Sequence, residues 1–283
     1  NISMGSYVNS IQLTKANSLR PVDDVIIIGF EAGTALNTGS YNNTFIGNYA
    51  GRQTTTGSIT AVGAYALYLN TTGTANTAIG GNDAVTAAAL QSNISGSYNT
   101  AVGTGSLQAN TTASYNTAVG YQAAYSQTTG GYNDAFGASA LYATTTGTSN
   151  TAIGRLSLTS NTTGAANVAL GTQALQANTT ASNNTAVGYQ AGYSNTTGAE
   201  LTAIGYQAGY SNTTGTITAV GTYALKSNTT GTYNVAVGLN ALYANTTGIG
   251  SVAVGYAAAR LSTAAGGVCA FGASAAYNNT VDN

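Results

Sequence analysis

The residues that could perform acid–base or hydrolytic chemistry are few and far apart in this sequence. Among its 283 residues there are 7 carboxylates and no histidine. Glycoside hydrolysis requires two carboxyl groups that face one cleft, but Asp23 and Asp24 are adjacent in the chain, and Asp83, Asp134 and Glu200 are each isolated. We therefore expect no catalytic residues and no enzymatic activity.

Metal and cofactor sites are not predicted either. With 1 cysteine and no histidine, the chain lacks the clustered ligands of a zinc site. None of its glycines precedes the Lys-Ser/Thr pair that completes a phosphate-binding loop. Cys269, in "VCAFG", is best explained as a small buried apolar residue. We expect no bound metal and no cofactor.

The chain is almost uncharged. Its 6 basic and 7 acidic residues make up 5% of the sequence, against about 25% in ordinary soluble proteins, and the formal net charge is −1. Such a surface has no basic patch for nucleic acid and no polybasic cluster for a membrane surface. No apolar run approaches the roughly 18 residues of a membrane helix. We expect neither a nucleic-acid partner nor membrane insertion by this chain.

The tripeptide "NTT" recurs eight times, and each copy fits the acceptor pattern for N-glycosylation. The copies begin at Asn70, Asn110, Asn161, Asn178, Asn195, Asn212, Asn228 and Asn245. The same letters are also explained by a turn, because Asn and Thr side chains bond to nearby backbone groups. We favour the structural interpretation.

A glycine in the recurring "A-V/I-G" step marks a unit that is repeated along almost the whole chain. The marker glycines are Gly29, Gly47, Gly63, Gly80, Gly103, Gly120, Gly137, Gly154, Gly171, Gly188, Gly205, Gly221, Gly238, Gly255 and Gly272. Most neighbouring markers are 17 residues apart, with occasional departures to 16, 18 or 23. A fixed period of this kind identifies a repeat protein in which each unit packs mainly on its neighbours.

One unit contains two short apolar segments and a turn. Counting from the marker glycine, position −2 is Ala in thirteen of the fifteen units and position −1 is Val, Ile, Leu or Phe. A second segment such as "QAL" and a turn such as "NTTG" follow. β-branched residues favour strands, and Asn and Gly favour tight turns. Two-helix repeats need about 33 residues, so the pattern predicts an all-β, parallel β-solenoid of about fifteen 17-residue coils with equivalent residues stacked.

The strand segment "T-A-V-G" has apolar residues next to each other, at positions −2 and −1. Neighbouring residues of a strand point to opposite faces, so only one of the two can lie inside the coil. A strand that is apolar on both faces is normally buried on both. We therefore expect several chains to associate along their length.

The repeat resembles the head domain of YadA-like trimeric autotransporter adhesins. The resemblance rests on "NVAVGLNAL" (234–242), "SVAVGYAAA" (251–259) and "NTAIGRLSL" (150–158), and it extends over residues 25 to 277. It implies a left-handed parallel β-roll made by three chains. Arrays with the "NTTG" turn are also similar to those of bacteriophage tail fibres. The repeat of the autotransporter heads is shorter, so each coil here has a longer turn.

Position +5 concentrates tyrosine and basic residues in one register. It includes seven tyrosines and three of the 6 basic residues, Arg52, Lys226 and Arg260. We expect this column to face solvent at the start of the turn, with rings packed edge to face and against the cations. It either stiffens the coil or binds a surface glycan. The glycan hypothesis assigns the contact to Tyr125, Tyr142, Tyr193, Tyr210 and Tyr243.

Two regions depart from the regular array. Residues 1–24 contain the single proline, Pro21, and resemble an attachment or capping segment ahead of the repeat solenoid of residues 25–283. The interval from Gly80 to Gly103 is 23 residues long, which places an irregular insertion within residues 81–98. A tolerated bulge is the favoured interpretation of the insertion, and a functional loop is the alternative.

These observations lead to the hypothesis of a structural and adhesive subunit of an extracellular fibre. The preferred form is a bacteriophage tail fibre that attaches to a host. The alternative is a bacterial surface adhesin or a self-assembling extracellular filament subunit, and a monomeric ice- or glycan-binding solenoid ranks below both. The expected partners are two further copies of the chain, a cell-surface glycan, and other fibre or baseplate subunits.

Overall fold

The computed structural model describes residues 11–14, 25–37, 40–81, 87–263 and 266–278, and this part of the chain forms strands and turns without any helix. The chain divides into two compact units, Asn1–Thr146 and Gly147–Asn283, called here the first and second unit. Within the described residues, 15 parallel strands delimit about 14 turns of roughly 17 residues. The predicted all-β solenoid is confirmed, with one turn fewer than the markers suggest.

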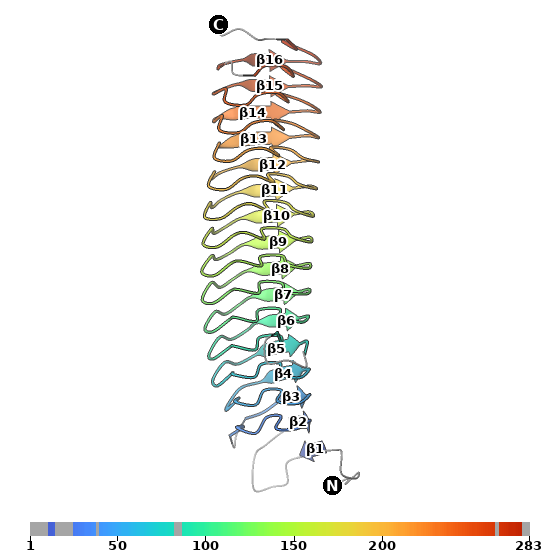
Figure 1. The fold of residues 1–283 in the computed structure, drawn as a ribbon, viewed down its shortest axis with the longest axis vertical. Helices are drawn as coiled ribbons and strands as arrows, with labels where there is room; N and C mark the ends of the chain where they lie inside the picture. The colour runs from blue at the N-terminus through green and yellow to red at the C-terminus, as the bar shows by residue number, and fades with distance from the viewer. Residues whose placement is uncertain (1–10, 15–24, 38–39, 82–86, 264–265, 279–283) are drawn as a thin grey trace. The chain divides into compact units, whose positions relative to one another are not determined.

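The first unit begins with one antiparallel pair and continues in parallel (Figure 1). Its strands are β1 (Ile11–Thr14), β2 (Val25–Ile28), β3 (Asn43–Ile46), β4 (Ile59–Val62), β5 (Asn76–Ile79), β6 (Thr100–Val102), β7 (Thr117–Val119) and β8 (Asp134–Phe136). β1 pairs antiparallel with β2, and each strand from β2 to β8 pairs in parallel with the next.

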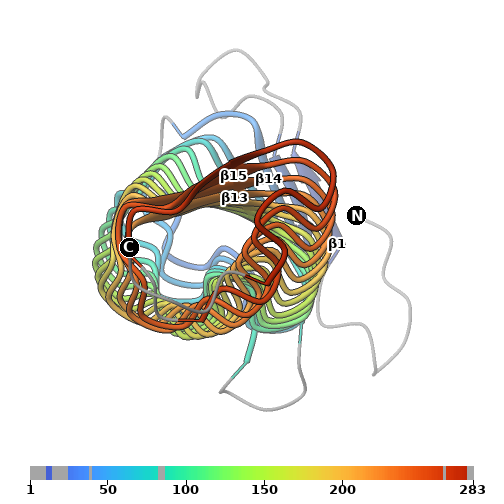
Figure 2. The same cartoon turned by 90° about the horizontal axis from the view of Figure 1, so that it is seen from above.

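The second unit is built from parallel strands only. They are β9 (Thr151–Ile153), β10 (Val168–Leu170), β11 (Thr185–Val187), β12 (Thr202–Ile204), β13 (Ile217–Val220), β14 (Asn234–Val237), β15 (Val252–Val254) and β16 (Cys269–Phe271). The register pairs equivalent residues of successive strands, so that Ala169 pairs with Ala186 and Ala186 with Ala203. Figure 2 shows β13, β14 and β15 one over another along one side of the coil.

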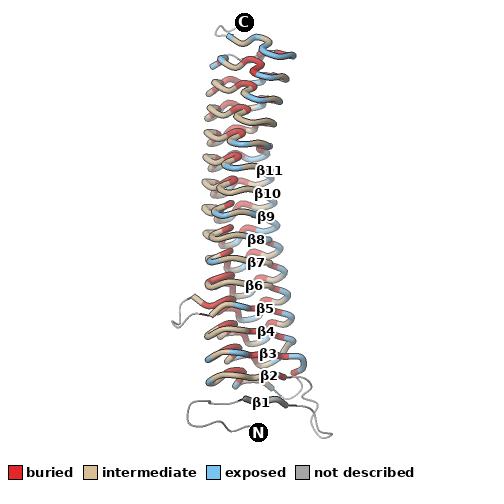
Figure 3. Tube along the Cα trace, turned by 90° about the vertical axis from the view of Figure 1, so that its right-hand side faces the viewer, coloured by how far each residue is buried: buried red, intermediate tan, exposed pale blue. Residues whose placement is uncertain are grey.

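From β3 onward, each strand turns the residue at position −2 inward and the residues on either side of it outward. In β11, Ala186 is fully buried, whereas Thr185 and Val187 on either side remain partly exposed. The same alternation recurs in the other strands from β3 to β16, and Figure 3 shows the buried positions repeating from coil to coil. The alanines at position −2 therefore form one inner wall, as the two-residue period of a strand requires.

The second apolar segment of the coil is not a strand. Gln173 and Leu175 have left-handed backbones, with φ of 61° and 49°. This conformation costs about 1–2 kcal/mol per residue without glycine. The segment is nevertheless held to both neighbours, because Gln173 N–H donates to Arg155 O and Leu175 N–H donates to Ala191 O, each at 3.0 Å. Burial of the Leu175 side chain contributes about 1.5–3 kcal/mol in the opposite direction.

The side-chain volume inside the coil is kept similar from coil to coil, because a small residue on one wall is matched by a larger residue on the other. Position +4 is usually a buried leucine such as Leu175. Where it is Gly192, the same coil has Leu201 at position −4, and a Cβ on Gly192 would lie 2.8 Å from the Leu201 side chain. Gly209 is matched in the same way by Ile217, at 3.2 Å. A side chain added on one wall therefore requires a smaller residue on the other.

Two columns of buried asparagines line the polar part of the interior. At position +7, the Asn212 amide donates to Asn195 Oδ1 at 3.0 Å and to the carbonyl of Gly215 in its own turn at 2.8 Å, and its Oδ1 accepts from Asn228 at 2.8 Å. Each amide thus closes its own turn and joins two coils. This row of hydrogen-bonded asparagines, called here the asparagine ladder, ends where another residue type occupies position +7, as Gln127 does after Asn110 and Ser262 after Asn245. At these ends, Asn110 Oδ1 and Asn245 Oδ1 are buried without a partner among the described residues.

The burial of these asparagines also distinguishes between the two interpretations of "NTT", a glycosylation acceptor and a turn. All eight asparagines of these tripeptides are 0% exposed. Their amide nitrogens lie inside the coil, where no glycosyl group fits. In the folded chain the tripeptide is therefore a turn, as the structural interpretation predicted.

The two irregular regions are described only in part. Of residues 1–24, only β1 lies within the described residues, so the capping or attachment role of this segment stays a prediction. Within 81–98, residues 82–86 are outside the described part. The coil has resumed by Leu90, whose N–H donates to Ser106 O as Leu107 N–H donates to Ala123 O, both at 3.0 Å.

The marker glycines combine an unusual backbone angle with a very close approach. Gly188 has a φ of +131°, and a Cβ placed on it would lie 2.6 Å from the carbonyl oxygen of Gly205 in the next coil. Gly272 has a similar φ of +118° but nothing within 4 Å. The two glycines therefore separate the cost of the backbone angle from the cost of the contact.

Replacing Gly188 by Ala should lower the thermal unfolding midpoint more than replacing Gly272 by Ala, because the added Cβ would collide with another coil only at Gly188. The expected difference is about 2 kcal/mol or more in the free energy of unfolding, the scale of overpacking in a filled interior. Paired thermal and guanidinium unfolding curves measure it. Equal losses would show that the backbone angle alone requires glycine.

Replacing Asn212 by Ala should destabilise the chain by about 2–4 kcal/mol, because it leaves buried donors and acceptors in three coils without partners. The matched control is Thr214→Ala, an exposed residue in the same turn, for which a change within about 0.5 kcal/mol is expected. Denaturant unfolding compares the two variants. Similar midpoints for both would contradict a stabilising role for the ladder.

Candidate binding surfaces

The tyrosines predicted at position +5 are partly buried at the start of the turn. Two pairs are stacked in parallel: Tyr125 on Tyr142, with ring centroids 5.2 Å apart, and Tyr193 on Tyr210, 5.0 Å apart, both with 7° between ring planes. The expected edge-to-face packing is wrong for these pairs. Parallel coils about 4.8 Å apart bring identical side chains face to face.

Cations interrupt this column as predicted. Lys226 Nζ lies 5.8 Å from the centroid of the Tyr243 ring, and Arg260 Cζ lies 5.4 Å from the same ring. Arg260 Nη1 also donates to the Tyr277 hydroxyl at 2.6 Å. Because neighbours cover the ring faces, the column mainly presents ring edges and hydroxyls. The structure does not bring the five predicted tyrosines into one site, and their contact with a glycan stays a prediction.

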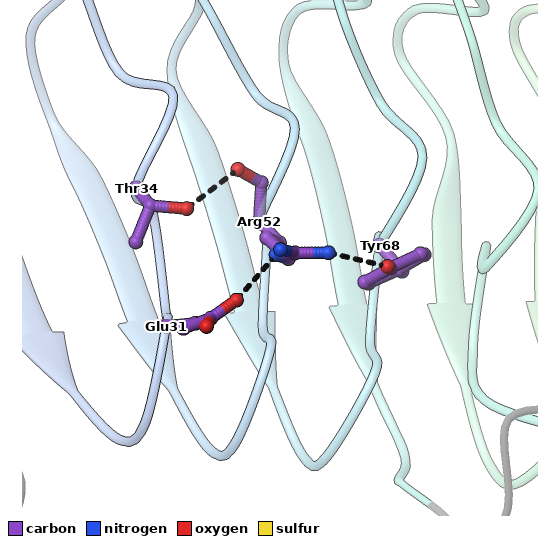
Figure 4. Close-up of polar contacts among 4 residues, drawn as sticks. All are labelled: Glu31, Thr34, Arg52 and Tyr68. Carbon is purple, nitrogen blue, oxygen red and sulfur yellow. Dashed lines mark hydrogen bonds and ion pairs between the residues drawn. The ribbon is translucent and has the colours of Figure 1, made fainter.

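The first unit has a related cluster across three successive coils (Figure 4). Arg52 Nε lies 2.7 Å from Glu31 Oε2, and Arg52 Nη1 donates to the Tyr68 hydroxyl at 2.8 Å. Thr34 Oγ1 donates to the carbonyl of Arg52 at 3.3 Å. The hydrogen bond with Tyr68 and, secondarily, the charge of Glu31 raise the pKa of Arg52 above its ordinary value. The guanidinium, which is always charged in proteins, thus joins these coils through its contacts with Glu31 and Tyr68.

A more exposed aromatic column was missed in the sequence. Tyr98, Tyr115 and Tyr132 occupy position −5 in three successive units and are 55%, 49% and 63% exposed. Their rings are stacked with centroid separations of 4.9 and 5.0 Å. The available signal was the tripeptide "SYN" or "GYN", in which a tyrosine directly precedes a buried asparagine in each unit. Tyrosines are fewer at −5 than at +5 over the whole chain, so the column is less conspicuous in the sequence.

Metal-binding side chains do not cluster in the described part of the chain. No group of three or more His, Cys, Asp or Glu side chains is close enough to hold a metal ion within this part of the chain. Nor does this part contain a helix suited to crossing a membrane. The expected burial of Cys269 is wrong: the residue is exposed on the outer face of β16, because position −3 points away from the alanine wall.

Comparison with known proteins gives no relative. The chain matches no protein-family model, no curated protein and no solved structure.

The stacked pair at position +5 should stabilise the fold beyond the area that each ring buries. A double-mutant cycle with Tyr193→Ala and Tyr210→Ala should give a coupling of about 0.5–1.5 kcal/mol in denaturant unfolding. The matched cycle pairs Tyr193→Ala with Tyr243→Ala, which lies in the same register but in a distant coil, and should be additive. Additivity in both cycles would mean that the stack does not stiffen the coil.

Proposed function

We propose that the chain is a structural and adhesive subunit of an extracellular fibre, in which copies associate through the outer face of their strands. The observation that supports this proposal is an apolar stripe that each unit leaves uncovered. The stripe consists of the residues at position −1, directly before each marker glycine.

The outer stripe is aliphatic or aromatic throughout the described residues of both units. In the first unit it comprises Ile28, Ile46, Val62, Ile79, Val102, Val119 and Phe136, and in the second Ile153, Leu170, Val187, Ile204, Val220, Val237, Val254 and Phe271. Several of these side chains are 36% to 66% exposed, although strand residues of this type are normally covered.

A second copy of the chain is the partner that fits this stripe. Any partner must present apolar groups at the spacing of the coils, and an identical solenoid has that spacing by construction. Within the described strands only Asp134 brings a charge to the face, at the position where the other strands have Thr or an apolar residue. Facing sheets can thus approach to the usual distance of about 10 Å without burying many charges.

The resemblance to YadA-like heads supports a specific form of this assembly: three copies with left-handed coils, arranged by closed symmetry. The "NTTG" arrays support a bacteriophage tail fibre as the context, with host attachment as the role. In that setting the partners are a cell-surface glycan and other fibre or baseplate subunits, and the site of action is extracellular.

A second candidate function uses the same face differently. Position −3 is mostly Thr, and the register stacks Thr185, Thr202 and Thr218 beside the apolar stripe on a short parallel sheet. This row of threonines lies on the strands and is distinct from the threonines of the "NTT" turns. A regular, nearly uncharged array of hydroxyl and methyl groups is suited to binding ice, provided that the face stays free of protein.

Analytical ultracentrifugation of the full chain should give about three times the chain mass of 28.0 kDa. Ile204→Asp should shift the sample toward monomer, because it places a charge in the covered stripe. The control is Thr197→Asp, an exposed turn residue away from the strands, which should leave the assembly intact. A wild-type monomer would overturn the fibre proposal, and thermal hysteresis by that monomer would favour ice binding.

A further inference from the structure

One coil of the first unit is a residue shorter than its successor. Gly47 and Gly63 are 16 residues apart, whereas Gly63 and Gly80 are 17 apart. The difference falls at the corner before β4, where Gly57 is followed by a single residue and then by Ile59 at position −4. Ile59 is buried and its N–H donates to Asn43 Oδ1 at 3.0 Å. The same kind of bond occurs in coils of regular length, such as Asn116 N–H to Asn99 Oδ1 at 3.0 Å, so the shorter corner keeps its attachment to the preceding coil.

A hollow of about 310 Å³ lies at this shortened corner. Its lining includes Ser40, Tyr41, Ser58, Thr74, Ala75 and Tyr98. The volume is at the lower end of the range of about 300–1,000 Å³ that small-molecule sites occupy. None of the lining residues is charged.

The aromatic column at position −5 ends at the hollow. Tyr98 stacks on Tyr115 with 3° between the ring planes, so one of its faces is covered. In the preceding coils the same position holds Ala75 and then Ser58, which are too small to continue the stack. The other face of Tyr98 therefore borders the hollow and is not covered by a ring.

The backbone at the hollow also has unused donors. Elsewhere in this column the N–H at position −5 bonds to the previous coil: Tyr98 N–H donates to Thr74 O at 2.9 Å and Tyr115 N–H to Ser97 O at 3.1 Å. The N–H groups of Ala75 and Ser58 have no such partner among the described residues, and neither has the Ser58 hydroxyl. These donors, on exposed residues, are open to a ligand.

An open aromatic face beside neutral donors and hydroxyls matches the chemistry of a pyranose ring. Such a ring packs its C–H face on an aromatic ring and bonds through its hydroxyls. We infer that the hollow binds a neutral saccharide unit of a surface polysaccharide. The inference rests on the proposed attachment role and names its ligand class and location, which is distinct from the tyrosines at position +5.

A single site of this size binds weakly, because it offers one ring face and a few hydrogen bonds. Association of several chains presents several copies of the hollow on one particle. The copies raise the overall avidity without new contacts. Binding is therefore best detected on a surface that displays many saccharides.

The test is binding of the full chain to immobilised neutral oligosaccharides of glucose, galactose, mannose and N-acetylglucosamine, with sialylated and sulfated oligosaccharides for comparison. Ala75→Tyr should extend the tyrosine stack into the hollow and weaken binding about tenfold or more. Ala75 has a φ of 54°, close to the 59° at Tyr98, so its backbone accommodates tyrosine. Tyr98→Ala should have a similar effect by removing the ring.

The matched control is Ala166→Tyr, the same substitution at position −5 in the second unit, where φ is also 54°. It should retain wild-type binding. The inference is overturned if the wild-type chain binds none of the neutral oligosaccharides, if it binds only the charged ones, or if Ala75→Tyr binds as well as Ala166→Tyr. Sedimentation of the same samples separates this result from the fibre proposal, since a monomer that binds saccharide contradicts only the fibre, and a non-binding trimer only the saccharide site.

Discussion

The contact between marker glycines of successive coils is the constraint on which the other features depend. Gly188 approaches Gly205 so closely that a Cβ would lie 2.6 Å from a carbonyl oxygen. This contact fixes both the spacing and the alignment of neighbouring coils. Once neighbouring coils are aligned, residues at the same position of the repeat lie against one another. Each repeat position therefore forms a row of equivalent side chains from coil to coil.

Stacking identical side chains in successive coils is favourable only for residue types whose side chains can bind to one another. An asparagine side chain has both donors and an acceptor, so a row of asparagines bonds along its length, as Asn195, Asn212 and Asn228 do. Tyrosines can stack in such a row, as Tyr98 does on Tyr115. A row of like charges would repel itself, which explains why a chain with this register has only 5% charged residues.

The two surfaces considered for binding have different origins in these rows. Within each unit the apolar stripe at position −1 runs from strand to strand because each strand turns one apolar residue outward, and this regularity would match that of a second copy of the chain. The hollow beside Tyr98 has the opposite origin. It forms because one corner is a residue shorter and because Ala75 and Ser58 replace the larger residues of the column. The proposed assembly therefore uses the repeat, and the proposed saccharide site uses a departure from it.

The sequence by itself determined the class of the fold. The spacing of the marker glycines, the alanines at position −2 and the turn residues predict a parallel β-solenoid with an alanine wall, because short-range preferences and a fixed period specify each coil independently of the rest. It also leads to the prediction, which the structure of one chain does not test, that copies associate through the outer strand face. Only the tertiary structure decided how the rows are arranged. The left-handed backbone of Leu175 is held by bonds to another coil, the rings of Tyr193 and Tyr210 are parallel because of the coil spacing, and the hollow depends on groups from several coils. A linear pattern contains the residues of these contacts but not their distances, since the distances follow from the stacking of whole coils.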